Sequence, residues 1–190
     1  MPNPVAVSTK AFTSSMEYLR IPPCLQLPKH SLPALYTRAS QPWVPPPVGS
    51  VKINTDAAWD SSSLFCGLAA IARDSSGKVI GGSDKSTFAS SSLAAEAQAI
   101  ALGLKLATSL SLSSFQLESD SLVLISALLN PLSTVDWSAS HIIAQIRVRS
   151  GLFHRVNWLW SSRVANAAAD LVAVLAKRRV CPEDCILFIY

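Results

Sequence analysis

Four acidic residues lie in surroundings that favour chemistry over packing: Asp56, Glu96, Asp120 and Asp170. Glu96 is in LAAEAQAI and Asp170 is in NAAADLVA, segments otherwise rich in residues that prefer a protein interior. Carboxylates that converge in a partly buried place repel one another unless a cation joins them, and oxygen ligands of this kind suit hard divalent ions such as Mg²⁺. Two such ions about 4 Å apart can activate water and stabilise a leaving oxygen in phosphodiester cleavage. The acids therefore predict metal-dependent hydrolysis, provided that the fold brings them together.

Each of these acids also has an ordinary structural explanation. Asp120 precedes an apolar run and can act simply as a helix N-cap. Glu96 and Asp170 can each lie on the solvated edge of a helix. These alternatives stay open at the level of the sequence, but they do not explain why all four acids fall where one order of elements can bring them together.

Three strands are predicted first. VKINTD (51–56) alternates apolar and polar residues, which is the period of a half-buried strand, and it places Asp56 at the strand's end. The segments 65–74 and 78–89 flank SSG, a turn in which Gly77 can supply a positive φ. Short connections of this kind indicate an antiparallel meander.

The hydrophobic period then changes to that of helices. SSLAAEAQAIALGLKLATSL predicts a helix over 91–110, with Ser91 or Ser92 as its N-cap. The remaining predicted elements are a strand at 115–119, a helix at 120–129 ended by Asn130-Pro131, a helix at 138–151, a strand at 153–161 and a helix at 164–179. The order is therefore β-β-β-α-β-α-α-β-α.

Residues 1–50 differ in composition from the rest of the chain. They hold ten of the 12 prolines and four Lys or Arg against one acid, which is most of the net charge of +4. Proline removes a backbone donor and fixes φ, so we expect a disordered lead-in or linker with a boundary near Gly49. The globular domain is predicted over 51–180, and 181–190 is a C-terminal extension.

No run of eighteen apolar residues and no secretory signal is present, so neither a membrane span nor export is expected. We expect an intracellular monomer, in the nucleus or cytoplasm, although the acid-poor, hydroxyl-rich first twenty residues have a weak organelle-targeting character. The four cysteines lack the paired spacing of a zinc site and are interpreted as reduced thiols.

Five motifs in sequence order resemble the plant reverse-transcriptase-like branch of the ribonuclease H superfamily, which is related to retroelements. They are VKINTDAAWD, GLAAIARDSSGKVIGG, SLAAEAQAIALGLKLA, FQLESDSLVLISALL and RVANAAADLVAVLA, and together they run from about Val51 to Lys177. The resemblance implies an α/β fold with a five-stranded mixed sheet, three strands antiparallel and two added in parallel, and helices on both faces.

The resemblance also implies a catalytic and metal-binding set, which transfers to Asp56, Glu96, Asp120 and Asp170. In that family two Mg²⁺ or Mn²⁺ ions promote attack of water on the RNA strand of an RNA–DNA hybrid, leaving a 3′-hydroxyl and a 5′-phosphate. Asp56 and Asp120 would be the central ligands. Glu96 would serve the metal nearest the leaving oxygen, and Asp170 the metal that activates water.

Two positions depart from the family pattern. Ala57 follows the first aspartate where glycine is usual, and Trp160 stands where the family has a histidine. Since tryptophan cannot act as a general acid or base, reduced activity is expected. Arg163 and Asn166 are predicted nucleic-acid contacts.

Two other functions compete with the hydrolase. A non-catalytic nucleic-acid-binding or structural remnant of a retroelement polyprotein would fit the proline-rich lead-in and Trp160. A proofreading-type 3′–5′ exonuclease would need Asp-x-Glu in the first motif, and residues 56–58 are Asp-Ala-Ala, so this alternative is disfavoured.

Overall fold

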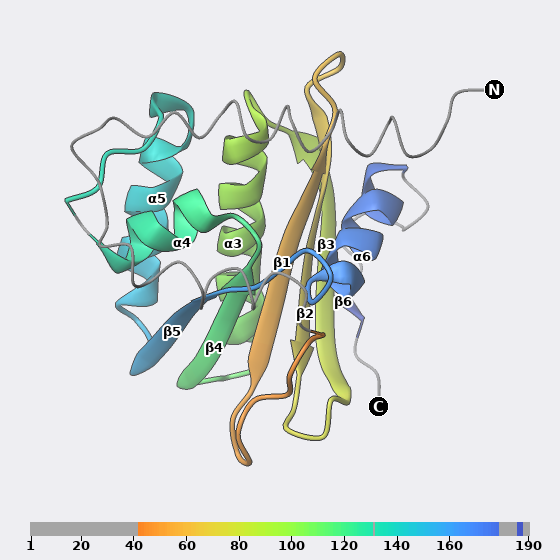
Figure 1. Ribbon diagram of the computed structural model, residues 1–190, viewed down its shortest axis with the longest axis vertical. Coiled ribbons are helices and arrows are strands. Elements are labelled where there is room, and N and C mark those ends of the chain that lie inside the picture. The colour runs from red at the N-terminus through yellow and green to blue at the C-terminus, as the bar shows by residue number, and fades with distance from the viewer. Residues whose placement is uncertain (1–41, 131, 179–185, 188–190) are drawn as a thin grey trace, which may run out of the picture. The chain divides into compact units, whose positions relative to one another are not determined.

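The computed structural model describes residues 42–130, 132–178 and 186–187. Its strands form a mixed sheet in the order β5-β4-β1-β2-β3-β6 (Figure 1). Strands β1, β2 and β3 are antiparallel neighbours, β4 lies parallel to β1, and β5 lies parallel to β4. The bounds are β1 Lys52–Trp59, β2 Phe65–Arg73, β3 Val79–Phe88, β4 Ser114–Ser119, β5 Arg155–Trp160 and β6 Ile186–Leu187. The predicted five-stranded sheet is confirmed, and the short β6 adds an antiparallel pair to β3.

The helices cover both faces of the sheet, as predicted (Figure 1). One face carries α3, which packs against β1 and β2, with α5 packed against α3 and α4 beside them. The other face carries α6, which packs across β1, β2 and β3. The bounds are α3 Ser92–Ser109, α4 Leu122–Leu129, α5 Trp137–Ser150 and α6 Ala167–Lys177.

Small residues let both helix layers approach the sheet closely. A Cβ added to Gly103 of α3 would lie 2.7 Å from Thr55 Cγ2. A Cβ added to Gly67 of β2 would lie 2.1 Å from the carbonyl oxygen of Ala173 in α6. The glycines therefore set how near α3 comes to β1, the strand that carries Asp56, and how near α6 comes to the neighbouring β2.

Most local signals in the sequence correspond to the observed structure. Ser91 caps α3, accepting a hydrogen bond from the backbone N–H of Ala94 at 3.1 Å. Gly77 has a φ of 83° in the β2–β3 turn.

Other local predictions are wrong. Helix α4 begins after Ser121, so Asp120 is not its N-cap, and its carboxylate is free to point elsewhere. Strand β1 continues to Trp59, so Asp56 lies inside the strand instead of at its end. Residues 164–166 form a turn ahead of α6 and are not part of that helix.

The described part of the lead-in, residues 42–50, has no helix or strand but contacts the sheet. The ring of Trp43 lies 3.5 Å from Arg73 Cζ, and Lys52 Nζ donates to the carbonyl of Val44 at 2.6 Å. The proline content predicts a poorly packed linker, whereas residues 42–50 make these specific contacts with the sheet. The remainder of the lead-in, 1–41, lies outside the described residues, as does the 181–190 extension except for β6.

Two further sequence expectations meet the structure only in part. Cys66 is buried and has a free thiol, while Cys24, Cys181 and Cys185 lie outside the described residues. Within the described ranges, no helix combines the length and the apolar character that a membrane crossing requires.

Candidate active site

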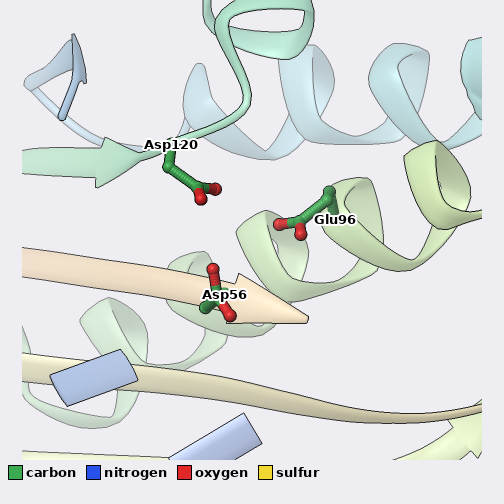
Figure 2. Close-up of side chains that lie close together, drawn as sticks. All are labelled: Asp56, Glu96 and Asp120. Carbon is green, nitrogen blue, oxygen red and sulfur yellow. The ribbon is translucent and has the colours of Figure 1, made fainter. Parts of the chain in front are cut away.

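Asp56 and Asp120 are brought together by the parallel pairing of β1 with β4. The last pair in that ladder is Thr55 with Ser119, and each acid is the next residue of its chain segment. Glu96 comes from α3, which packs against β1. Figure 2 shows the three side chains, from a strand, a helix and a loop, pointing toward one shared space.

These three carboxylates form a cluster that can hold a metal ion. One oxygen from each of Asp56, Glu96 and Asp120 lies within 4.8 Å of the others. Asp56 is only 4% exposed. Glu96 Oε2 is buried and has no hydrogen-bond partner among the described residues. An all-oxygen donor set with an unpartnered buried atom fits a hard divalent cation, which would supply the missing partner.

The charges of the cluster repel one another in a poorly solvated place. Burial raises the pKa of Asp56 to about 8, and the charges of Asp120 and Asp170 contribute to that increase. Burial also raises the pKa of Glu96 well above its usual value, followed by the charges of Asp56 and Asp120, while a hydrogen bond from the backbone of Ala57 opposes the shift. Such shifts mark a site that favours a cation or bound protons.

Asp120 has a partner at the rim of the cluster. Burial raises its pKa, and the nearby guanidinium of Arg163 opposes the increase. Arg163 Nε lies 3.4 Å from Asp120 Oδ2, and the Arg163 side chain is 87% exposed. Trp160 Nε1 donates to the carbonyl oxygen of Asp120 at 2.9 Å, which ties β5 to this loop. Arg163 therefore offers most of its hydrogen-bond donors to solvent or to a ligand.

The fourth predicted acid, Asp170, is outside the three-carboxylate cluster. It lies in the first turn of α6 and is exposed. Its charge nevertheless contributes to the raised pKa of both Asp56 and Asp120. The structure thus places three of the four acids close enough together to bind one cation. Asp170 lies farther away but still affects the pKa of Asp56 and Asp120.

Asn166, predicted from the sequence as a nucleic-acid contact, is almost completely buried in this structure. Its side chain is 1% exposed. Asn166 Nδ2 donates to the carbonyl of Thr55 at 2.9 Å and to Asp56 Oδ1 at 3.2 Å. Its Oδ1 accepts from Asn54 Nδ2 at 3.1 Å. The amide orients Asp56 from behind.

Asn54 is a residue that the sequence interpretation missed. It occupies a strand position in VKINTD and is completely buried. Asparagine is unfavourable in strands, so a buried one needs polar partners, and this was the available signal.

Sequence comparison assigns the family. Residues 54–176 match the family model described as reverse transcriptase-like. The chain belongs to this family. The matched range of the reverse transcriptase-like domain includes Asp56, Glu96, Asp120 and Asp170. A search of curated proteins finds none that matches the chain.

Solved structures show which fold the domain has. The N-terminal RNase H domain of Rv2228c from Mycobacterium tuberculosis superposes with a TM-score of 0.63 at 20% identity, covering 68% of this chain and 94% of that one. RNase H1 from the halophilic archaeon Halobacterium salinarum gives 0.64 at 18% identity, covering 69% and 99%. LC11-RNase H1, obtained from compost by metagenomics and solved with an RNA/DNA hybrid, gives 0.63 at 14% identity, covering 69% and 99%. The reverse transcriptase-like domain therefore has the ribonuclease H fold, with a cluster of acidic residues.

Proposed function

We propose that this protein is a ribonuclease H, a divalent-metal-dependent endonuclease that hydrolyses the RNA strand of RNA–DNA hybrids. The observation that supports it is the convergence of Asp56, Glu96 and Asp120 from three separate elements, with Glu96 Oε2 buried and unpartnered in the described structure. Burying several carboxylates together costs free energy, and acids that served only as helix caps or as solvated surface would have no reason to be buried in one place.

Mg²⁺ or Mn²⁺ is the proposed cofactor, with two ions in the complete site. Asp56, Glu96 and Asp120 would hold it, and Asp170 would join them from α6. Bound metal would lower the pKa of a water molecule and neutralise charge on the leaving oxygen.

The protein's own residues would orient the reaction. Asn166 holds one oxygen of Asp56 through its Nδ2, which directs the carboxylate into the cluster. The exposed guanidinium of Arg163 is suited to a substrate phosphate next to Asp120. The water oxygen bonds to phosphorus, the bond from phosphorus to the 3′ oxygen breaks, and a proton ends on that oxygen, giving a 3′-hydroxyl and a 5′-phosphate.

An RNA–DNA hybrid is the proposed substrate, and a structural neighbour, LC11-RNase H1, was solved with such a hybrid. Proteins recognise these duplexes largely through phosphates and minor-groove 2′-hydroxyls, so we expect little sequence specificity.

The direct test is cleavage of an end-labelled RNA–DNA hybrid by the purified full chain, first with Mg²⁺ and then with Mn²⁺. We expect metal-dependent cuts in the RNA strand that disappear in Asp120→Asn, and no cuts in an all-DNA duplex. A folded wild-type protein that leaves the hybrid intact with both metals would overturn the proposal.

A second candidate is a nucleic-acid-binding domain without catalytic activity, and Trp160 is the observation that favours it. The indole stands where the resemblance implies a histidine, and its N–H is used by the Asp120 carbonyl. Metal titration separates the two functions. A catalytic site should bind Mn²⁺ and lose that binding in Asp120→Asn. A non-catalytic domain should bind the hybrid equally well with and without Mn²⁺, in the wild type and in Asp120→Asn.

A further inference from the structure

Asn54 lies at the centre of a buried polar cluster that joins the lead-in to Asp56. Asn54 Oδ1 accepts from Trp43 Nε1 at 2.9 Å and from Arg73 Nη2 at 2.8 Å. Asn54 Nδ2 donates to Glu118 Oε2 at 2.9 Å and to Asn166 Oδ1 at 3.1 Å. The amide thereby uses both of its acceptor sites and both of its donor hydrogens.

The partners of Asn54 allow only one orientation of its amide. The Trp43 indole and the Arg73 guanidinium can only donate, while the Glu118 carboxylate accepts. The NH₂ group of Asn54 must therefore face Glu118 and Asn166. Asn166 in turn must present its oxygen to Asn54 and its NH₂ group to Asp56.

We propose that Asn54 is a positioning residue for Asp56, acting through Asn166, and that Trp43 of the lead-in supports Asn54 by donating to its Oδ1. The inference rests on the proposed function, since it concerns the same carboxylates. The Asn166 amide is held by two contacts besides Asp56: its Nδ2 donates to the Thr55 carbonyl, and its Oδ1 accepts from Asn54. Without the Asn54 donor, Asn166 Oδ1 would lose the hydrogen bond that fixes the oxygen side of the amide, and the orientation of Asp56 Oδ1 would be held less firmly.

Trp43 matters because it holds the other end of the cluster. Its ring lies 3.5 Å from Arg73 Cζ. Arg73 Nε is buried and has no hydrogen-bond partner among the described residues, so the stacked ring, the Asn54 oxygen and the charge of Glu118 hold this guanidinium. The backbone next to Trp43 is anchored too, because Lys52 Nζ bonds the Val44 carbonyl and pairs with Glu118 Oε1 at 2.7 Å.

The test measures Mn²⁺ binding to the full chain by calorimetry, without substrate. Asn54→Asp keeps the shape of the side chain and can still accept from Trp43 and Arg73, but its ionised carboxylate cannot donate to Asn166. We expect Mn²⁺ binding to weaken about tenfold, the range found when a residue behind a metal ligand is changed. The added negative charge by itself would strengthen cation binding, so weaker binding runs against the direct charge effect and is what lost positioning predicts.

Glu118→Gln is the matched control within the same cluster. It removes the ion pair with Lys52, but its amide oxygen can still accept from Asn54 Nδ2, so the path to Asp56 is kept. Charge alone predicts tighter binding for Asn54→Asp and weaker binding for Glu118→Gln. Positioning predicts that Asn54→Asp binds Mn²⁺ more weakly than Glu118→Gln does. In hybrid cleavage, positioning also predicts a lower kcat for Asn54→Asp with little change in KM.

The inference is overturned if Asn54→Asp binds Mn²⁺ as tightly as the wild type. Should that variant fail to fold, Asn54→Ala decides the question in the same way, because it removes the donor to Asn166 without adding a charge. Trp43→Ala, which removes one donor to Asn54 and the ring stacked on Arg73, should weaken Mn²⁺ binding less. A wild-type protein that binds no Mn²⁺ would overturn the proposed function as well, whereas normal wild-type binding with unaffected variants overturns only the positioning role.

Discussion

At the scale of single residues, the burial of Asp56, Glu96 and Asp120 next to one another destabilises the ionised form of these acids. Burial and mutual repulsion raise the pKa of Asp56 and Glu96, so the protein without metal is less stable at the pH where these acids ionise. Strongly shifted pKa values of this kind are typical of functional sites. The exposed Asp60 shows the ordinary alternative, since hydrogen bonds from Ser62 lower its pKa.

Asp56→Asn should abolish function while stabilising the metal-free fold. The amide removes a charge that is buried beside two other acids, so we expect a higher Tm at pH 8 in EDTA and a loss of hybrid cleavage of at least about a hundredfold. Thermal unfolding and cleavage rates check this. Asp60→Asn is the control, and we expect it to leave cleavage unchanged and stability equal or lower. If Asp56→Asn still cleaves the hybrid, Asp56 is not a catalytic residue.

The stability of the metal-free protein should depend on pH in a defined direction. The pKa of Asp56 is about 8 in the folded chain against an ordinary value of 3.8, so the folded state binds more protons than the unfolded state between these values. The free energy of unfolding in EDTA should therefore fall as pH rises, by roughly 2–4 kcal/mol between pH 5 and pH 8. Urea titrations at several pH values measure it. A flat or rising profile would show that Asp56 ionises without penalty.

At the scale of secondary-structure elements, the site depends on what packs on each side of β1. The end of the β1–β4 ladder sets Asp56 next to Asp120, and α3 supplies Glu96 from one face. From the other face, the turn ahead of α6 inserts Asn166 behind Asp56. The distance between α6 and the sheet is therefore part of the site's geometry.

Gly67→Ala should separate α6 from β2. The new methyl carbon would lie 2.1 Å from the Ala173 carbonyl oxygen and 2.2 Å from the backbone nitrogen of Lys177. Both are backbone atoms of α6, which cannot move aside as a flexible side chain can. We expect a loss of about 3 kcal/mol in the free energy of unfolding, with weaker Mn²⁺ binding in whatever remains folded.

Gly151→Ala is the control for that substitution. Gly151 follows α5 with a φ of −66° and is not covered by another element, so the change should cost little. Chemical denaturation of both variants measures the difference, and a Gly67→Ala protein as stable as the wild type would contradict the close packing.

At the scale of the whole molecule, electrostatic attraction to nucleic acid should be modest. The chain has 16 Lys and Arg against 12 acids, and most of the excess lies in residues 1–50. The exposed Arg163 is the cation placed directly at the acidic cluster in the described structure. Hybrid affinity is therefore expected to be weak and to fall with added salt.

Arg163→Ala should weaken hybrid binding and reduce its salt dependence. Loss of one phosphate contact is expected to lower the slope of log affinity against log salt by about one. Fluorescence anisotropy at several salt concentrations measures both quantities. Lys78→Ala, an exposed cation in the β2–β3 turn, should leave the slope unchanged. An unaltered slope in Arg163→Ala would exclude Arg163 as a phosphate contact.

Local patterns in the sequence were enough for the order of elements, while the fold followed from the resemblance to the ribonuclease H superfamily. Alternation in VKINTD, the three- and four-residue spacing after Ser91 and the glycine of the SSG turn each depend on neighbouring residues, because strand, helix and turn are local conformations. The apolar surroundings of Glu96 likewise marked it as unusual before any contact was known. The same local reasoning left open whether Asp120 caps a helix, because an aspartate ahead of an apolar run has the same sequence signature whether or not it caps; in the structure the cap is Ser121.

The sequence by itself singled out the four acids as candidates for the chemistry and predicted the elements that carry them. Only the tertiary structure decided that Asp56, Glu96 and Asp120 share one space while Asp170 stays outside it, and that Trp43 reaches Asp56 through Asn54 and Asn166. Asn54 and Asn166 are separated by 112 positions in the chain. Hydrogen bonds over such separations depend on sheet register and helix docking, and these are set by packing of the whole domain.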